Sequence, residues 1–287
     1  MIPTHAVNRV LRWVGHLHWV RFGIRDRIIR TLWHQGGDDR FEVDFFGLRY
    51  SGRLGSFLDW SVYFFGAYEA SMLELFADVV GPDRDATFID VGANEGHHSL
   101  FMGRLCQVHA MEPDPRVRER FERRLAENGL DTVWVHAVGL GAADEMREFY
   151  AAGDHNTGMG SFLAGYHVEN RSIGSVAVVN GDRFLADLGP MDIRLIKIDV
   201  EGFERAVVEG LRETLEHHRP HVVMEFSRFT RDSFRSYREM MSVFPAGYRV
   251  RRIEQFEPRW LLFNKPGYRL CDFDFGGADG ELLFMSN

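Results

Sequence analysis

Acidic side chains follow the ends of three short apolar segments of the chain. Asp90 stands near the end of the first segment, Glu112 follows the second, and Asp199 and Glu201 follow the third, which also contains Lys197. Carboxylates can accept hydrogen bonds from hydroxyls, face a cation or take up a proton. If the three segments are neighbouring parallel strands, their carboxyl ends meet at one edge of a sheet, where open α/β sheets bind ligands. We therefore expect these groups to line one crevice.

The first segment breaks into the turn D-V-G-A-N-E-G at residues 90–96, which then re-enters a helix. Gly92 and Gly96 have no Cβ, so a ligand could approach the bare backbone. The spacing differs from the dinucleotide pattern G-x-G-x-x-G. Asp90, two residues before the first glycine, suits a cationic amino group better than a pyrophosphate. The predicted cofactor-binding residues here are Asp90, Gly92, Ala93, Asn94, Gly96 and His97; a purely structural glycine turn is the alternative.

Glu112 lies about twenty residues beyond the glycine turn. A carboxylate there can accept hydrogen bonds from both hydroxyls of a ribose. NAD-dependent enzymes use the same device, so Glu112 and the adjacent Pro113 indicate adenosine without choosing a cofactor. Ala137 and Val138, at the end of the third predicted strand, are expected against the adenine. The alternative for Glu112 is a surface acid that caps a turn.

The segment K-I-D-V-E-G-F-E at residues 197–204 places a lysine inside an apolar strand. A buried lysine is costly unless an acid faces it. Asp199, two residues on, lies on the same side of the strand, and Glu225 at the end of the following strand is another candidate partner. The candidate catalytic residues are Asp199, Glu201, Lys197 and Glu225, and Asp199 also counts among the cofactor-binding residues. A closed ion-pair network that only orders the strand ends is the alternative.

Strands alternate with helices from residue 85 onward, which predicts a doubly wound, mostly parallel α/β sheet. Residues 139–181 read as an irregular functional insertion with one edge strand near 146–150. A helix is expected at 203–217 and another at 232–244. The last two strands, near 248–253 and 281–285, could pair antiparallel. Residues 1–84 form an N-terminal extension with amphipathic helices at 6–34 and a β-hairpin at 41–58, and residues 85–287 form the main domain.

Four motifs occur in one order along residues 60–286. They are G-x-Y-E at 66–69, F-I-D-V-G-A-N-x-G at 88–96, E-P at 112–113 and I-K-I-D-V-E-G-x-E at 196–204. Together they resemble the FkbM-type family of class I S-adenosylmethionine-dependent methyltransferases, and N-T-G-M-G-S-F at 156–162 resembles that family's glycine-serine loop more loosely. The resemblance implies a seven-stranded Rossmann-like methyltransferase sheet with an antiparallel last strand. It also implies S-adenosyl-L-methionine as donor and O-methylation of a hydroxyl on a sugar, glycolipid or secondary metabolite.

A proton acceptor would assist such a reaction because an alcohol is a poor nucleophile at neutral pH. Asp199 and Glu201 are the favoured candidates, with His97, His155 and Glu225 as alternatives. The spacing of the acids matches no recognised metal signature, so no metal is predicted. An NAD-dependent oxidoreductase of Rossmann architecture remains an alternative function. A non-catalytic, methyltransferase-like protein that binds a membrane peripherally is a further one.

The composition limits the range of partners. The 287 residues carry a formal net charge of −8, which argues against nucleic-acid binding by bulk electrostatics. Two distant cysteines suit a reducing compartment, and no apolar run is long enough to span a membrane, so a cytoplasmic protein is expected. The helices at 6–34 carry six arginines and one aspartate, which fits either a helical cap or a peripheral contact with an anionic membrane. The expected acceptor is a small molecule, a carbohydrate or a lipid-linked substrate, and the oligomeric state is left open.

Overall fold

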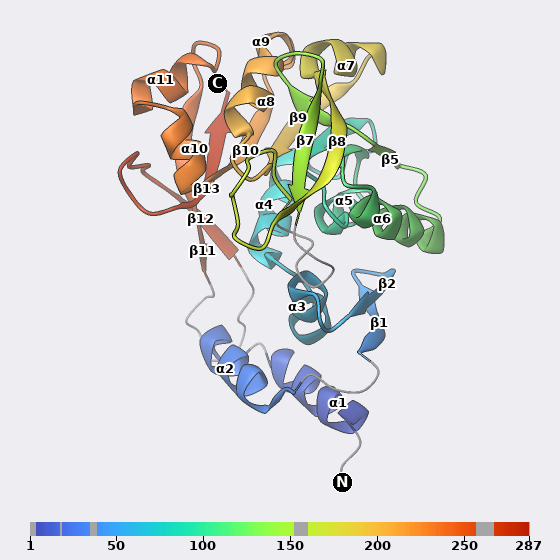
Figure 1. Ribbon diagram of the computed structural model, residues 1–287. Coiled ribbons are helices and arrows are strands. Elements are labelled where there is room, and N and C mark those ends of the chain that lie inside the picture. Colours follow the sequence, from blue (N-terminus) through green and yellow to red (C-terminus); the bar gives the residue numbers. More distant parts are fainter. Residues whose placement is uncertain (1–3, 18, 35–38, 152–159, 257–266, 287) are drawn as a thin grey trace. The chain divides into compact units, whose positions relative to one another are not determined.

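The computed structural model describes residues 4–17, 19–34, 39–151, 160–256 and 267–286, and Figure 1 shows their helices and strands. The chain forms two compact units. The first comprises Met1–Leu75 with Gln255–Arg269, and the second comprises Phe76–Glu254 with Leu270–Asn287. A segment near the C-terminus therefore belongs with the N-terminal extension, which the sequence-based division at residue 84 did not include.

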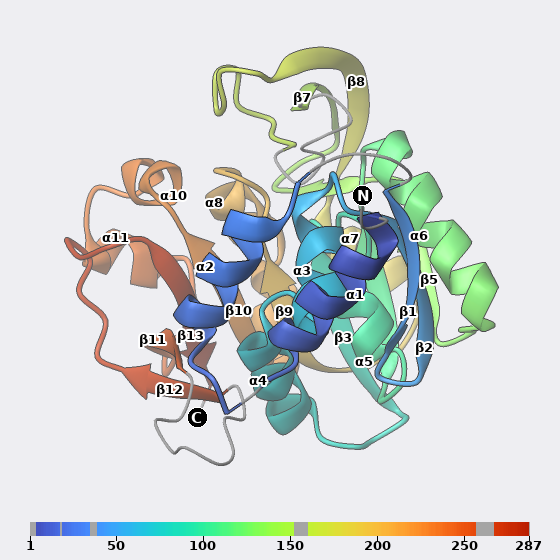
Figure 2. The same cartoon turned by 90° about the horizontal axis from the view of Figure 1, so that it is seen from below.

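The first unit contains three helices and one hairpin. The helices expected at 6–34 are α1 (Thr4–Gly15) and α2 (Phe22–Leu32), which contact each other and lie side by side in Figure 2. The expected hairpin consists of β1 (Arg40–Phe45) and β2 (Leu48–Arg53), and α3 (Phe57–Phe65) follows. Phe46 and Gly47 join the two strands with φ angles of 53° and 84°. Two positive φ angles match the twist of a two-residue hairpin turn.

The core of the first unit lies between α1, α2 and α3. Leu11, Ile29, Trp60 and Phe64 are buried together there, with Leu54 from the end of the hairpin. Arg25 of α2 is also buried and donates a hydrogen bond to the carbonyl oxygen of Gly15 at the end of α1. One face of each N-terminal helix therefore packs inward.

An eight-stranded sheet forms the centre of the second unit. Its order is β12-β11-β13-β10-β9-β3-β4-β5. The strands are β3 (Ala86–Val91), β4 (Gln107–Met111), β5 (Val133–His136), β9 (Asp192–Ile198), β10 (His221–Phe226), β11 (Arg249–Phe256), β12 (Gly267–Cys271) and β13 (Gly280–Met285). The strands from β10 to β5 are parallel, and β13 runs antiparallel to both β10 and β11. The expected doubly wound sheet with a reversed last strand is confirmed, and β12 is an eighth strand that was not expected.

The helices of the second unit cover the sheet through alternating strand residues. Ile89 and Ile196 pack in one core with Val207 and Leu211, whereas Phe88 points the other way and meets the ring of Phe76. The helices are α4 (Ala70–Val80), α5 (His97–Met102), α6 (Pro115–Asn128), α7 (Gly181–Asp187), α8 (Glu204–Gly210), α9 (Arg212–His218), α10 (Arg228–Ser233) and α11 (Tyr237–Ser242). Both faces of β3 are therefore buried, as a central parallel strand requires.

Two expected helices are divided in the structure. The helix predicted at 203–217 is α8 and α9, which meet at Leu211 directly after Gly210. A Cβ on Gly210 would lie 1.9 Å from the carbonyl oxygen of Gly141, so glycine permits a close approach here. The helix predicted at 232–244 starts later than expected, as α11, because Ser236 caps α11 by accepting a hydrogen bond from the Glu239 amide, and residues 232–233 belong to the separate helix α10.

The prediction that residues 139–181 are irregular is partly wrong. They contain β6 (Gly139–Gly141), β7 (Glu145–Ala151) and β8 (Arg171–Asn180), which form a separate sheet in the order β6-β8-β7. The expected edge strand near 146–150 is β7. Long-range pairing of β7 with β8 is what the local sequence did not reveal.

Candidate functional site

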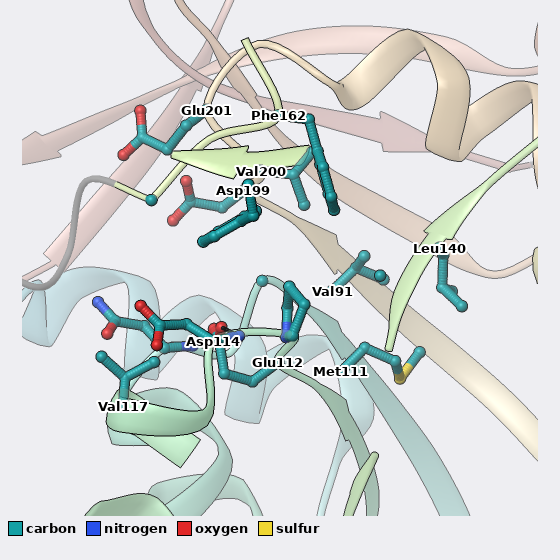
Figure 3. Close-up of a pocket in the computed structure, with 16 residues that line it drawn as sticks. Val91, Met111, Glu112, Asp114, Val117, Leu140, Phe162, Asp199, Val200 and Glu201 are labelled. Atoms are coloured by element: carbon teal, nitrogen blue, oxygen red, sulfur yellow. Dashed lines mark hydrogen bonds between the residues drawn. The ribbon is translucent and has the colours of Figure 1, made fainter. Parts of the chain in front are cut away.

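A pocket opens at the carboxyl ends of β3, β4 and β9 and is closed on another side by β6 and β7 (Figure 3). The lining residues are Val91, Gly92, Asn94, Met111, Glu112, Pro113, Asp114, Val117, Gly139, Leu140, Phe149, Gly160, Phe162, Asp199, Val200 and Glu201. The strand ends and the inserted sheet thus meet around one space. The positions of the acids in the sequence predicted this meeting for the strand ends.

The glycine turn after β3 owes its glycines to contacts within the protein. A Cβ on Gly92 would lie 1.9 Å from the carbonyl oxygen of Asp199, and a Cβ on Gly96 would lie 2.0 Å from the ring of Phe121. Both glycines also have φ near 80°. Gly92 lines the pocket and Gly96 does not, so the space that Gly96 leaves is filled by Phe121.

Asp90 and Lys197 form a buried charge network beneath the pocket. They are partners across β3 and β9. The Lys197 Nζ atom lies 3.0 Å from Oδ2 of Asp199 and 3.6 Å from Oδ1 of Asp90, while Ser99 donates a hydrogen bond to Asp90. Burial alone would lower the pKa of Lys197, but the carboxylates of Asp199 and Asp90 raise it above its ordinary value. Lys197 therefore stays a cation and holds Asp199 at the pocket, while Asp90 and Lys197 do not line it.

Glu112 is held by backbone donors. Its Oε2 accepts from the Asn94 amide at 2.8 Å, and its Oε1 accepts from the Asp114 amide at 2.8 Å. Burial raises the pKa of Glu112 to about 7, with a smaller contribution from the charges of Asp114 and Asp90. Each oxygen still has a lone pair available. Glu112 is therefore a positioned acceptor for hydroxyl donors.

Glu201 stands on the opposite side of the pocket, beside Asp199 (Figure 3). Its φ is 52°, a conformation that few residues other than glycine adopt. The hydroxyl of Ser161 donates to its carbonyl oxygen at 2.7 Å, which ties the inserted segment to the end of β9. Burial and then the charge of Asp199 raise the pKa of Glu201 to about 8, against a hydrogen bond from the Tyr166 hydroxyl that lowers it. Glu201 thus titrates near neutral pH.

Two further acids surround Glu201 without lining the pocket. Glu204 is fully buried and accepts hydrogen bonds from the Gly202 amide and the Thr230 hydroxyl, so it orders the turn after β9. Burial and the charges of Asp199 and Glu201 raise the pKa of Glu225 to about 10. Glu225 therefore carries a proton at neutral pH and is a poor candidate for a proton acceptor.

The structure separates the predicted site residues into two groups. Those that line the pocket are Gly92, Asn94, Glu112, Pro113, Asp199 and Glu201. Those that do not are Asp90, Ala93, Gly96, His97, Ala137, Val138, Lys197 and Glu225. His97 begins α5 and is buried, with its ring beside that of His98. The chain reaches the pocket at Gly139 and Leu140, directly after Ala137 and Val138, which were expected against the adenine. His155 lies outside the described residues.

Several lining residues were not identified from the sequence. They are Met111, Asp114, Val117, Leu140 and Phe149. Asp114 was recognised only as the cap of α6, and it does accept a hydrogen bond from the Arg116 amide. Phe149 and Phe162 have rings 5.0 Å apart and come from the segment that was expected to be irregular. Phe162 ends the glycine-serine motif at 156–162, whereas no local signal pointed to Phe149, because β7 pairs with β8 over a long range.

The pocket has one sign of charge. Asp199 and Glu201 face Glu112 and Asp114 across it (Figure 3), and none of its lining residues within the described ranges is a lysine, arginine or histidine. Val91, Met111 and Leu140 form an apolar side. The described residues contain no group of three or more His, Cys, Asp or Glu side chains that could hold a metal ion. Such a pocket suits an organic cation that also has hydroxyls and an apolar ring, and it would repel a pyrophosphate.

The model of the methyltransferase FkbM domain family matches residues 90–269. No curated protein matches the chain. A solved structure of methyltransferase FkbM from Methylobacillus flagellatus KT is 16% identical, with 78% of this chain and 52% of that chain covered and a TM-score of 0.41. This chain therefore spans about half the length of that protein.

Two other solved structures also match. A SAM-dependent methyltransferase from Agrobacterium tumefaciens is 13% identical over 87% of this chain and 70% of that chain, with a TM-score of 0.46. An rRNA methylase from Streptococcus thermophilus is 11% identical over 75% of this chain and 93% of that chain, with a TM-score of 0.42.

Proposed function

Because the chain belongs to the methyltransferase FkbM domain family, we propose that it transfers a methyl group from S-adenosyl-L-methionine to a hydroxyl oxygen of a sugar, glycolipid or secondary metabolite. The observation that carries the proposal is the pocket with four carboxylates and an apolar side. The donor is a cation with a ribose and an adenine, and each of these parts has a counterpart among the lining residues. When bound, it supplies an electrophilic methyl group on a positively charged sulfur.

Glu112 would hold the ribose. Its two oxygens are fixed by the amides of Asn94 and Asp114, so they need no reorientation when they accept hydrogen bonds from two hydroxyls. Leu140 and Met111 offer apolar contacts for the adenine. Asn94 has a side-chain oxygen that is buried without a hydrogen-bond partner in the structure, and it can accept from a further donor.

Asp199 and Glu201 would divide the remaining work. Asp199 is oriented by the ammonium of Lys197 at 3.0 Å and faces the cationic part of the donor. Glu201, with its pKa raised to about 8, suits the uptake of a proton from the acceptor hydroxyl, since a catalytic base works best when its pKa lies near the working pH. A nearby cation would lower the pKa of Glu201 and favour its ionised form. Glu201 is therefore our choice for the proton acceptor.

Calorimetric titration of the full chain tests the donor. We expect binding of S-adenosylmethionine and S-adenosylhomocysteine and no binding of NADH. Tight NADH binding would favour the oxidoreductase instead. In the same titration Glu112→Gln should weaken donor binding. Glu119→Gln, at an exposed site on α6, is the matched control and should not weaken it.

A screen of labelled methyl transfer across sugars, glycolipids and polyketide alcohols tests the acceptor. We expect label on a hydroxyl oxygen of one of these classes, and loss of that label in the variant Glu201→Gln. Donor binding without transfer to any hydroxyl in the screen would contradict the O-methylation part of the proposal. It would leave the assignment of the donor in place.

A further inference from the structure

The helices α1 and α2 expose large apolar side chains. Among the described residues, fourteen large hydrophobic side chains are exposed, and seven of them lie between residues 10 and 32. The ring of Phe22 packs against that of Phe65, with the ring centroids 4.8 Å apart. The other six form what we call the outer patch: Val10, Trp13, Trp19, Ile24, Ile28 and Leu32. This concentration in a short segment is not expected of an ordinary surface.

The core of the first unit does not need the outer patch. Leu11 and Ile29 are 3% and 0% exposed and already supply the inward faces of α1 and α2. Trp13 and Ile24 are 63% and 52% exposed. Each helix therefore has a second apolar stripe in addition to the one that packs inward.

The spacing of the patch residues places them in rows along the helices. Ile24, Ile28 and Leu32 are four residues apart and follow one face of α2, while Val10 and Trp13 are three apart on α1. The two helices contact each other and run side by side (Figure 2). The apolar rows thus belong to two adjacent short helices.

The charge around the patch is strongly positive. Residues 4–32 carry six arginines and one aspartate, a formal charge of +5, which leaves −13 for the rest of a chain whose total is −8. Arg9, Arg21, Arg27 and Arg30 are exposed, and Asp26 pairs with Arg30. The segment that exposes the apolar rows therefore has a net positive charge, whereas the rest of the chain has a net negative one.

We propose that α1 and α2 form a peripheral docking surface for an anionic lipid bilayer, with the outer patch inserted at the level of the headgroups. Apolar side chains with two tryptophans, flanked by arginines, are the pattern of helices that lie in the membrane interface. None of the helices in the described ranges is long and apolar enough to cross a membrane. A second copy of the chain is a worse occupant, because a two-fold contact would bring the two +5 segments together.

Flotation of the full chain with vesicles tests the proposal without reference to catalysis. We expect binding to vesicles of equimolar phosphatidylcholine and phosphatidylglycerol, and little binding to phosphatidylcholine alone. Binding should weaken as salt is added. Emission from Trp13 and Trp19 should shift to shorter wavelength on binding. No binding to the anionic vesicles, or equal binding to both kinds, would overturn the proposal.

Matched variants locate the surface. Ile24→Ser with Ile28→Ser should weaken partitioning at least tenfold, and Arg9→Gln or Arg27→Gln should each weaken it about fivefold, from the attraction of a basic residue near an anionic surface. Val168→Ser and Arg123→Gln change exposed residues outside the segment and should have no effect. Effects of the same size in these controls would overturn the proposal. So would a concentration-dependent dimer that the double variant abolishes.

Discussion

Glu112, which is buried, and Glu201, which is half-buried, lie on opposite sides of one pocket, and their surroundings differ. Glu112 accepts hydrogen bonds from two backbone amides, while Glu201 accepts one from Tyr166 and lies beside the charge of Asp199. Backbone donors fix the position of Glu112, whose pKa is raised mainly by burial. At Glu201 the charge of Asp199 is the largest cause after burial, so its proton is sensitive to any cation that arrives. The comparison indicates that Glu112 binds and Glu201 exchanges a proton.

The largest effect should come from replacing Gly92, whose backbone packs against that of Asp199. A Cβ at residue 92 would collide with the Asp199 carbonyl, and φ is already positive. We expect Gly92→Ala to lower the free energy of unfolding by about 2–5 kcal/mol and to abolish ligand binding. Gly81→Ala has a similar φ with open space around it and should cost only about 1–2 kcal/mol. Urea denaturation measures both, and equal losses would show that the collision is unimportant.

Glu201→Gln should slow methyl transfer far more than Glu112→Gln does. The amide keeps an acceptor for Tyr166 but cannot take up a proton at neutral pH. We expect methyl transfer to the acceptor found by the screen to slow by about 10²–10⁴-fold, the usual contribution of general base catalysis. Donor affinity should change less than tenfold. Full activity in this variant and in Asp199→Asn would remove both residues from the mechanism.

Glu112→Gln should show the opposite pattern. The glutamine side chain puts an NH2 group where the backbone N–H of Asn94 or Asp114 now donates, so one of these backbone donors loses its acceptor. We expect the dissociation constant of S-adenosylhomocysteine to rise about 10–100-fold, from the loss of hydrogen bonds to a charged group. The rate at saturating donor should be nearly retained. A larger loss of rate than of affinity would show that Glu112 and Glu201 do not have different roles.

A smaller effect should appear in the stability of the free protein as a function of pH. The folded-state pKa values of Glu112 and Glu201 are raised to about 7 and about 8. The folded state therefore binds more protons than the unfolded state between about pH 4.5 and these folded-state values, and stability falls as the pH rises through that range. Between pH 7 and 8 Glu112 has already lost more of its proton than Glu201. Thermal melts should therefore show a flatter slope in this interval for both variants, with the larger flattening for Glu201→Gln.

Local signals were sufficient for most strands and for the acids at their ends. The alternation of strands and helices predicted the central sheet, and Lys197 between apolar neighbours predicted the buried pair with Asp199. The contact of Gly96 with Phe121 could not be predicted, because a glycine that admits a ligand and one that admits a side chain have the same local sequence. The entry of Gly139 and Leu140 into the pocket was not expected for a similar reason, since the chain turns into β6 at Gly139 only through its pairing with β8.

The order of residues along the chain was enough to determine that carboxylates would gather at one sheet edge, because parallel strands bring their ends together. Strand adjacency, the inserted sheet and the burial of each acid depended on the folded chain. They set the raised pKa of Glu201, the apolar side formed by Leu140 and Met111, and the exposure of the outer patch. Each of these properties comes from contacts between segments far apart in the sequence, and such contacts have no local pattern of their own.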